Sequence, residues 1–369
     1  MDRFVKPKIL LALFGLLLLG FIAVALRPAP VVVALWFEGS GSGAGLGSKV
    51  QHAVLQALDY RNQTARRLVP YRYVPVVLTG LPEEAALERI RSSGAVVVLG
   101  GATSSFTGRI SGLLERRGIP CISPTANSPI LARSGDLLFR YTGPSGGEAA
   151  GALARLRGDF SRYVAVLDRS NPVYGVPQLA GFATGLGISP QRVLEVEGTQ
   201  DLESVLGVLA SGLYDGAVFF LPAFLTGVYA QRIAEAHPKM TLWTSDWGVT
   251  ERSAALAGPG VRNLISAVFF PPRFPDPNHP FLVFLGRRYS AVLDPSVLDP
   301  GYGAVAMLDG AVQLGGSTSK GVLRGLQALQ YVEGLTGTFP VDAAGDVQLP
   351  LVPVTLRDGH WAPLEGQRR

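Results

Sequence analysis

The stretch VVLGGATSSFTGRISGLLERRGIPCISPTANSP, residues 97–129, contains the pattern that decides the fold. An apolar run leads through two glycines into a segment with apolar residues at three-to-four spacing (104–117), and a second apolar run (119–122) follows. Short apolar runs are typical of strands buried on both faces, and three-to-four spacing is typical of an amphipathic helix. The stretch therefore predicts a βαβ unit within a parallel sheet.

The same alternation continues on both sides of this unit. Further strands are expected at 31–37, 71–78, 95–99, 163–167, 217–221 and 264–269. Helices are expected at 48–62, 82–92, 104–117, 146–157, 176–186, 202–213 and 225–236. A chain of this kind is expected to fold as doubly wound α/β sheets.

Two breaks in this alternation predict two lobes. The chain has 369 residues, whereas single cores stop growing at about 300 residues. The first break is the glycine-rich segment 143–147, and the second is the proline-rich segment 270–280, after which only helices are expected until about Leu335. If those helices return to the first sheet, the expected N-terminal lobe is 31–143 with 272–334, and the C-terminal lobe is 144–271 with 335–369. Ligands of such folds bind between the lobes, at the carboxyl ends of the strands.

The N-terminal segment, residues 1–30, has the order of an export signal. Arg3, Lys6 and Lys8 precede an unbroken apolar run from 9 to 26, and Ala23-Val24-Ala25 supplies a small-residue cleavage pattern. The run is also long enough to remain as an uncleaved membrane anchor. Either reading predicts an exported, extracytoplasmic body, with the membrane reached only through this segment.

Several kinds of site are disfavoured by the composition and the motifs. The net charge of +5 comes from scattered Lys and Arg residues, so no nucleic-acid partner is expected. The glycine-rich segment 39–47 has neither dinucleotide-binding nor phosphate-loop spacing, and is read as a ligand-facing loop. The single cysteine, Cys121, and four unclustered histidines predict no metal site, no cofactor and no catalytic nucleophile–base pair.

Two clusters of polar side chains follow neighbouring strands. Ser104 and Ser105 come after the strand that ends at Leu99, whereas Thr125 and Asn127 come after the run that ends at Ile122. If these strands are neighbours, the clusters face one crevice, and the first turn of a helix starting at Ser104 offers free N–H groups to a carboxylate. The alternative reading is that Ser104 is only a helix N-cap.

At these residues the sequence resembles the branched-chain amino-acid (Leu/Ile/Val) binding proteins of ABC transporters. Besides 97–105 and 118–129, the resemblance extends over nearly the whole mature chain through the motifs at 139–140, 301–311, 335–337 and 342–346. It implies a two-lobed type I periplasmic-binding fold, in which two doubly wound parallel sheets are joined by a three-strand hinge. It also implies an ABC-transporter permease as partner.

The resemblance further implies roles for individual residues. Ser104, Thr125 and Asn127, with Ser105 beside them, stand where that family holds the ligand carboxylate, although Asn127 replaces the usual threonine. Asp246 matches the acidic residue that meets the ligand ammonium. Tyr174 and Phe224 resemble covering aromatics, with ordinary packing as the alternative, whereas Leu46 stands where another aromatic is usual.

The function expected from these observations is capture of a small polar ligand, an amino acid or related carboxylate, for uptake. Closure of two lobes about a hinge is the expected mechanism. A membrane-anchored ligand-sensing domain is the alternative, and N-terminal sequencing distinguishes the two. An enzyme on the same scaffold is disfavoured because no nucleophile–base pair is visible.

Overall fold

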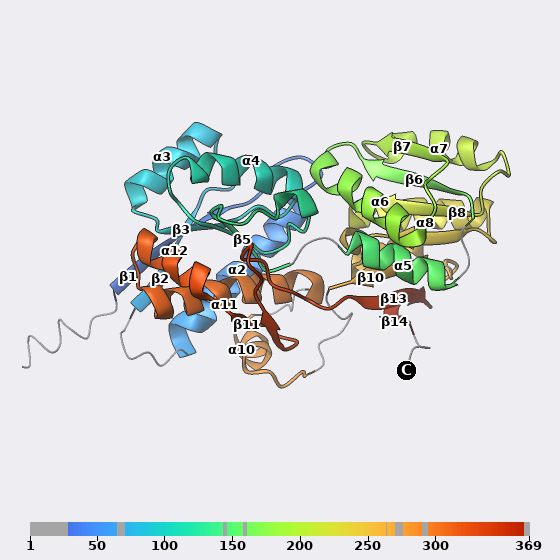
Figure 1. Cartoon of the computed structure of the whole chain (residues 1–369). Coiled ribbons are helices and arrows are strands. Elements are labelled where there is room, and N and C mark those ends of the chain that lie inside the picture. The colour runs from blue at the N-terminus through green and yellow to red at the C-terminus, as the bar shows by residue number, and fades with distance from the viewer. Residues whose placement is uncertain are drawn as a thin grey trace, which may run out of the picture.

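The computed structural model describes residues 29–64, 71–142, 146–157, 161–262, 264–269, 276–289 and 294–364. The predicted export segment at 9–26 therefore lies outside the described residues. Two sheets with their helices form two lobes that lie side by side (Figure 1). Within the described part of the chain, no helix combines the length and the apolar character needed to cross a membrane.

The first lobe contains a five-stranded, all-parallel sheet in the order β2-β1-β3-β4-β5. Its strands are β1 (Ala29–Trp36), β2 (Tyr71–Val77), β3 (Val97–Gly100), β4 (Cys121–Ser123) and β5 (Leu138–Arg140). Three helices alternate with them: α2 (Ala44–Thr64), α3 (Glu83–Ser93) and α4 (Ser104–Glu115). The short helix η1 (Pro129–Leu131) follows β4. The βαβ unit expected from 97–129 is thus β3-α4-β4.

The second lobe contains a seven-stranded sheet in the order β14-β13-β10-β9-β8-β6-β7. Its parallel strands are β6 (Tyr163–Asp168), β7 (Arg192–Val196), β8 (Gly216–Phe220), β9 (Thr241–Thr244) and β10 (Leu264–Val268). Its helices are α5 (Gly147–Arg157), α6 (Pro172–Leu186), η2 (Thr199–Asp201), α7 (Leu202–Leu209), α8 (Ala223–Ala236), η3 (Asp246–Gly248) and α9 (Glu251–Ala257).

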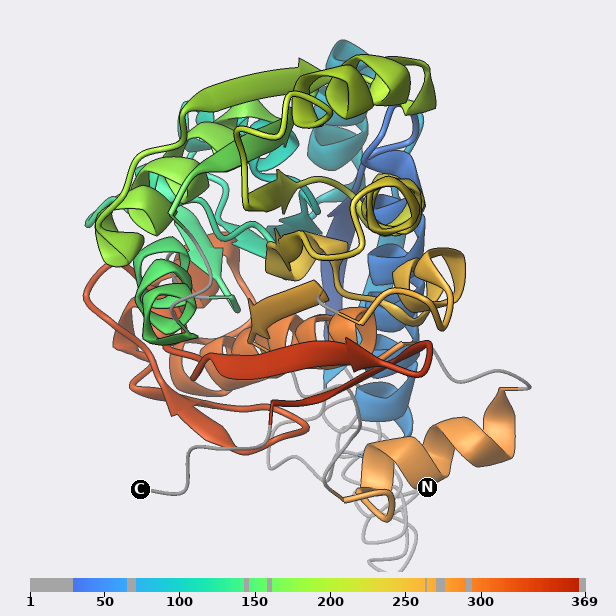
Figure 2. The same cartoon turned by 90° about the vertical axis from the view of Figure 1, so that its right-hand side faces the viewer.

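The end of the chain adds an antiparallel edge to this second sheet. Strand β13 (Val352–Arg357) pairs antiparallel with β10, and β14 (His360–Pro363) pairs antiparallel with β13. In Figure 2 this hairpin lies across the second lobe, beside β10. The expectation of two purely parallel sheets therefore holds for the first lobe and is corrected at this edge, because a hairpin needs no crossover helix.

After β10 the chain returns to cover the first sheet. Helices α10 (Pro280–Arg288) and α11 (Pro295–Gly315) contact α2, and α12 (Ser319–Ala328) packs on α11. The small hairpin β11 (Tyr331–Glu333) and β12 (Thr338–Pro340) follows. The expectation of helices alone up to Leu335 is wrong at β11, whose three-residue strand alternates exposed and buried residues and is too short to register as a pattern.

The packing shows where the chain passes between lobes. It leaves the first lobe after β5, returns after β10 and leaves again before β13; residues 143–145 and 270–275, at the first two passages, lie outside the described residues. Leu335, Val347 and Leu349 all pack in the core of the first lobe. We therefore propose to place the third passage at about residues 350–352, later than the expected boundary at 335.

Candidate functional site

A cavity of about 90 Å³ lies between the lobes, at the carboxyl ends of strands from both sheets. A single buried water needs about 10–15 Å³, so the cavity has room for a molecule several times larger. The first lobe lines it with residues that follow β3, β4 and β5 and with the start of α11. The second lobe lines it with residues that follow β6 and β9, with the end of β10 and with Trp361 of β14.

Ser104 is the first residue of α4 and lines this cavity, with 1% of its surface exposed. The N-cap is Thr103, whose side chain accepts a hydrogen bond from the Phe106 N–H (3.3 Å). The alternative reading of Ser104 as the cap is therefore wrong by one position. The Ser104 hydroxyl oxygen instead accepts the Ser128 N–H (3.2 Å), which leaves the hydroxyl hydrogen free to be donated.

Thr125 and Asn127 also line the cavity, from the loop after β4. The Thr125 hydroxyl donates to the Ala102 carbonyl oxygen (2.8 Å) and so joins this loop to the turn that precedes α4. The Asn127 amide donates across the cavity to Asp246 Oδ2 (2.8 Å). The polar clusters after β3 and β4 thus meet at one crevice, because β3 and β4 are neighbours.

Asp246 and Tyr174 come from the second lobe and face these residues. The Tyr174 hydroxyl donates to Asp246 Oδ1 (2.7 Å), and its ring lies edge-on to Trp247 at 5.5 Å between centroids. Desolvation raises the pKa of Asp246, although the bonds from Tyr174 and Asn127 oppose that rise. None of the described residues that line the cavity is Lys, Arg or His.

The structure does not bring Ser105 and Phe224 to the cavity lining. The backbone N–H of Ser105 donates to Asn171 Oδ1 (3.0 Å), which lies in the other lobe. Phe224 is the second residue of α8, is 41% exposed, and has the Arg252 guanidinium over its ring at 5.2 Å. The five other expected residues, Ser104, Thr125, Asn127, Tyr174 and Asp246, all line it.

A buried carboxylate that the sequence did not point to positions the turn before α4. Glu38, which follows β1, is 6% exposed and accepts the N–H groups of Ala102 (3.0 Å) and Thr103 (2.6 Å) and the Thr103 hydroxyl (2.7 Å). The glycine-rich segment wraps this residue: a Cβ at Gly47 would lie 2.9 Å from the Glu38 carbonyl oxygen. Close approach of the backbone, rather than flexibility, therefore explains a glycine here.

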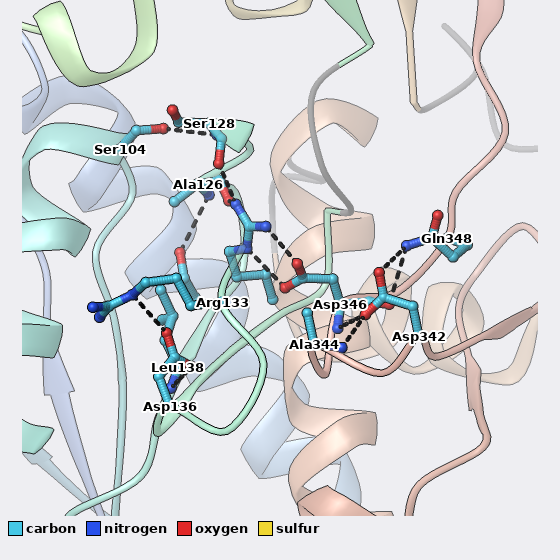
Figure 3. A network of polar contacts seen from close by, with 12 residues as sticks. Ser104, Ala126, Ser128, Arg133, Asp136, Leu138, Asp342, Ala344, Asp346 and Gln348 are labelled. Atoms are coloured by element: carbon cyan, nitrogen blue, oxygen red, sulfur yellow. Dashed lines mark hydrogen bonds and ion pairs between the residues drawn. The ribbon is translucent and has the colours of Figure 1, made fainter. Parts of the chain in front are cut away.

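A second buried network, of hydrogen bonds and an ion pair, attaches the loop after β4 to the closing segment of the chain (Figure 3). The Arg140 guanidinium donates to Asp346 Oδ1 (2.7 Å) and Oδ2, and to the carbonyl oxygen of Ser128 (2.6 Å). The N–H of that same Ser128 donates to Ser104. The loop that carries Thr125 and Asn127 is thus fixed to the closing segment of the chain.

Two further lining residues, Thr142 and Ser296, have side-chain oxygens that are buried and lack a hydrogen-bond partner among the described residues. Thr142 follows β5, and Ser296 lies in the first turn of α11. Neither could be predicted from the sequence, because each lies in an irregular or proline-containing segment. Asn171, at the start of α6, was missed for the same reason.

Comparison with solved structures identifies the fold. The benzoate complex of an ABC-transporter solute-binding protein from R. palustris superposes with a TM-score of 0.78 at 20% identity, over 91% of this chain and 96% of that one. The branched-chain amino acid transporter protein LivJ from Streptococcus pneumoniae, bound to isoleucine, gives a TM-score of 0.78 at 19% identity, over 91% and 99%. A second R. palustris solute-binding protein, bound to 4-hydroxybenzoate, gives 0.76 at 13%, over 92% and 96%.

No protein-family model matches the sequence, and no curated protein matches it. At these identities the superpositions establish the architecture, whereas function is decided by the residues of the site. The chain therefore has the two-lobed type I periplasmic-binding fold, which is the fold of the branched-chain amino-acid-binding proteins that its motifs resemble.

Proposed function

We propose that this protein is an extracytoplasmic solute-binding protein that captures a small polar molecule between its lobes and delivers it to an ABC-transporter permease. The observation that carries the proposal is the cavity between the lobes, in which Asn127 of one lobe and Tyr174 of the other both donate to Asp246. An amino acid or related carboxylate is the first ligand class to test, because Ser104 can donate to a carboxylate and Asp246 can accept an ammonium group.

Closure of the lobes is the proposed mechanism. Besides the Asn127–Asp246 bond, the Ser105 N–H reaches Asn171 and the hydroxyls of Ser42 and Ser170 bond across the cleft. A neutral bond contributes only about 0.5–1.5 kcal/mol and a bond to a charged group about 1.5–3 kcal/mol, so a ligand that contacts both lobes adds free energy that favours the closed form. A permease would then distinguish closed from open protein.

A binding role, rather than catalysis, is supported by the chemistry of the lining. Among the described residues, the cavity is lined by no histidine, the side chain that most often serves as general base, and by no cysteine or lysine. Ser104, whose residue type can act as a nucleophile, is bonded to the Ser128 N–H rather than to a base. The thiol of Cys121 lies in β4, where burial raises its pKa to about 12 and keeps it protonated. We accordingly propose that the bound ligand is released unchanged.

Native mass spectrometry of the full chain purified from its own cells tests the proposal. A small molecule of defined mass, released intact on unfolding and rebound by the emptied protein, is the expected result. Recovery of a chemically altered product would contradict the binding role. N-terminal sequencing of the exported protein tests the alternative, a membrane-anchored ligand-sensing domain, because an anchor requires residues 9–26 to be retained.

A further inference from the structure

Two further polar residues of the cavity lining come from the first lobe: Thr142 after β5, and Ser296 in the first turn of α11. The residue before Thr142, Tyr141, packs on α11: its hydroxyl donates to Asp299 Oδ2 (3.4 Å), one turn along the helix from Ser296. Thr142 and Ser296 therefore come from two segments that contact each other.

The hydroxyls of Thr142 and Ser296 are unusual because they are buried and have no partner among the described residues. Thr142 is 2% exposed. A buried hydroxyl without a hydrogen bond destabilises a protein, and such groups in folded proteins are rare enough to need an explanation. Both residues line the cavity, so a polar group of a ligand is the partner that these hydroxyls can gain.

Asp294, which also lines the cavity, already has hydrogen-bond donors. It accepts the Ser296 N–H with Oδ1 (2.9 Å) and the Glu251 N–H with Oδ2 (3.1 Å), at the N-terminal ends of α11 and α9. Glu251 itself has an exposed side chain, 3.7 Å from the His360 ring. Among the described residues that line the cavity, Thr142 and Ser296 are the two whose buried side-chain oxygens lack a partner.

We propose that Thr142 and Ser296 form a subsite for an uncharged polar group of the ligand, a hydroxyl or a carboxamide, separate from the charged head that Ser104 and Asp246 would meet. The inference rests on the proposed function and narrows its ligand class. Amino acids with hydroxyl or amide side chains fit such a site. Aliphatic amino acids and benzoate, whose distal ends are hydrocarbon, would leave both hydroxyls buried without partners.

Isothermal titration of the ligand-free full chain with two isosteric pairs tests the inference. Valine and threonine form one pair and leucine and asparagine the other, so that each pair differs in polarity and hardly in shape. The polar member of at least one pair is expected to bind about tenfold more tightly or better, as for one hydrogen bond gained against an unpaired partner. Equal or tighter binding of both apolar members would overturn the subsite and leave the binding function intact.

The variant T142V/S296A removes both hydroxyls with little change in volume. It is expected to abolish the preference within each pair while it leaves the affinity for the apolar members unchanged or improved. A preference that survives the double substitution would overturn the proposal. The matched control is S105A, because the Ser105 hydroxyl is also buried and unpartnered among the described residues but lies outside the cavity lining; its preference should equal that of the wild type.

The two proposals fail in distinguishable ways. If none of the four amino acids binds, the molecule identified by native mass spectrometry decides the question. A molecule whose distal end is hydrocarbon would overturn the polar subsite. A molecule with a distal hydroxyl or amide that binds T142V/S296A more weakly than the wild type would support it. A chain that neither binds these amino acids nor releases any small molecule fails as a solute-binding protein, and the subsite fails with it.

Discussion

Arg140 and Asp346 are 206 positions apart in the sequence and form a fully buried ion pair. The pair joins the last strand of the first sheet to the closing segment, and through Ser128 it reaches the loop that carries Asn127. Removing one partner leaves the other charge buried without compensation. We expect R140M or D346L alone to lower the free energy of unfolding by about 3–5 kcal/mol, measured by urea denaturation.

The double variant R140M/D346L replaces both charges by apolar groups and is expected to recover most of the loss from either single change. The exposed pair of Arg91 and Glu88 gives the control, since R91A should cost less than about 1 kcal/mol. If R140M and D346L lowered the free energy of unfolding no more than R91A does, the buried pair would not be required for stability.

Ser104 and Ser105 are adjacent serines with different surroundings. S104A removes a hydroxyl from the cavity lining and leaves the Ser128 N–H without its acceptor. We expect weaker ligand binding by about tenfold or more and a loss of about 1–3 kcal/mol in unfolding free energy. In S105A both quantities should stay near wild type. Equal affinity in the two variants, measured by calorimetry with the ligand that co-purifies, would remove Ser104 from the site.

Asp294 caps α11 and also bonds across the cleft to the Glu251 N–H. Asparagine is as good an N-cap as aspartate, but an amide nitrogen placed where Oδ2 now lies cannot accept the Glu251 N–H. D294N should therefore keep the unfolding free energy within about 1 kcal/mol and increase the rate of ligand dissociation about tenfold. Stopped-flow measurement of dissociation checks this, and an unchanged rate would show that the bond does not stabilise closure.

Burial raises the pKa of Asp299 to about 7, whereas an unfolded chain gives about 3.9. Between these values the unfolded state loses its proton first, so the contribution of Asp299 to stability falls as the pH rises from about 4 to about 7 and is constant outside that window. In D299N this contribution is absent. The unfolding free energy of D299N minus that of wild type should therefore rise across the window and then level off. Parallel curves for wild type and D299N across this range would contradict a raised pKa for Asp299.

The sequence predicted most of the strands that are covered on both faces, because such strands are nearly continuous apolar runs; β6 and β8 were placed to within one residue. It did not predict the buried strands β5 and β9, which have only three and four residues. It missed β7, an edge strand with exposed positions such as Glu195. It also missed β13 and β14, whose pairing is set by contacts with β10 rather than by a local pattern.

The residues of the site likewise divide into those that a local sequence pattern predicts and those that only the fold shows. Ser104, Thr125 and Asn127 were predictable because Ser104 follows β3, whereas Thr125 and Asn127 follow β4, and these two apolar strands are neighbours in one sheet. Glu38 also follows such a strand, but a charged residue before glycines is ordinarily solvated, and only the fold shows it buried against Ala102 and Thr103. Phe224 was expected at the ligand, yet α8 turns it to the surface beside Arg252.

The antiparallel edge formed by β13 and β14 has a consequence for the order in which the second lobe can be completed. Trp361 of β14 lines the cavity, packs in the second core, and donates to the Thr250 carbonyl oxygen (3.1 Å). These two strands follow the segment that covers the first lobe, so the second sheet gains its edge only after the chain has passed through the other lobe. A chain cut before residue 352 would lack both edge strands and the indole that they place in the cavity lining.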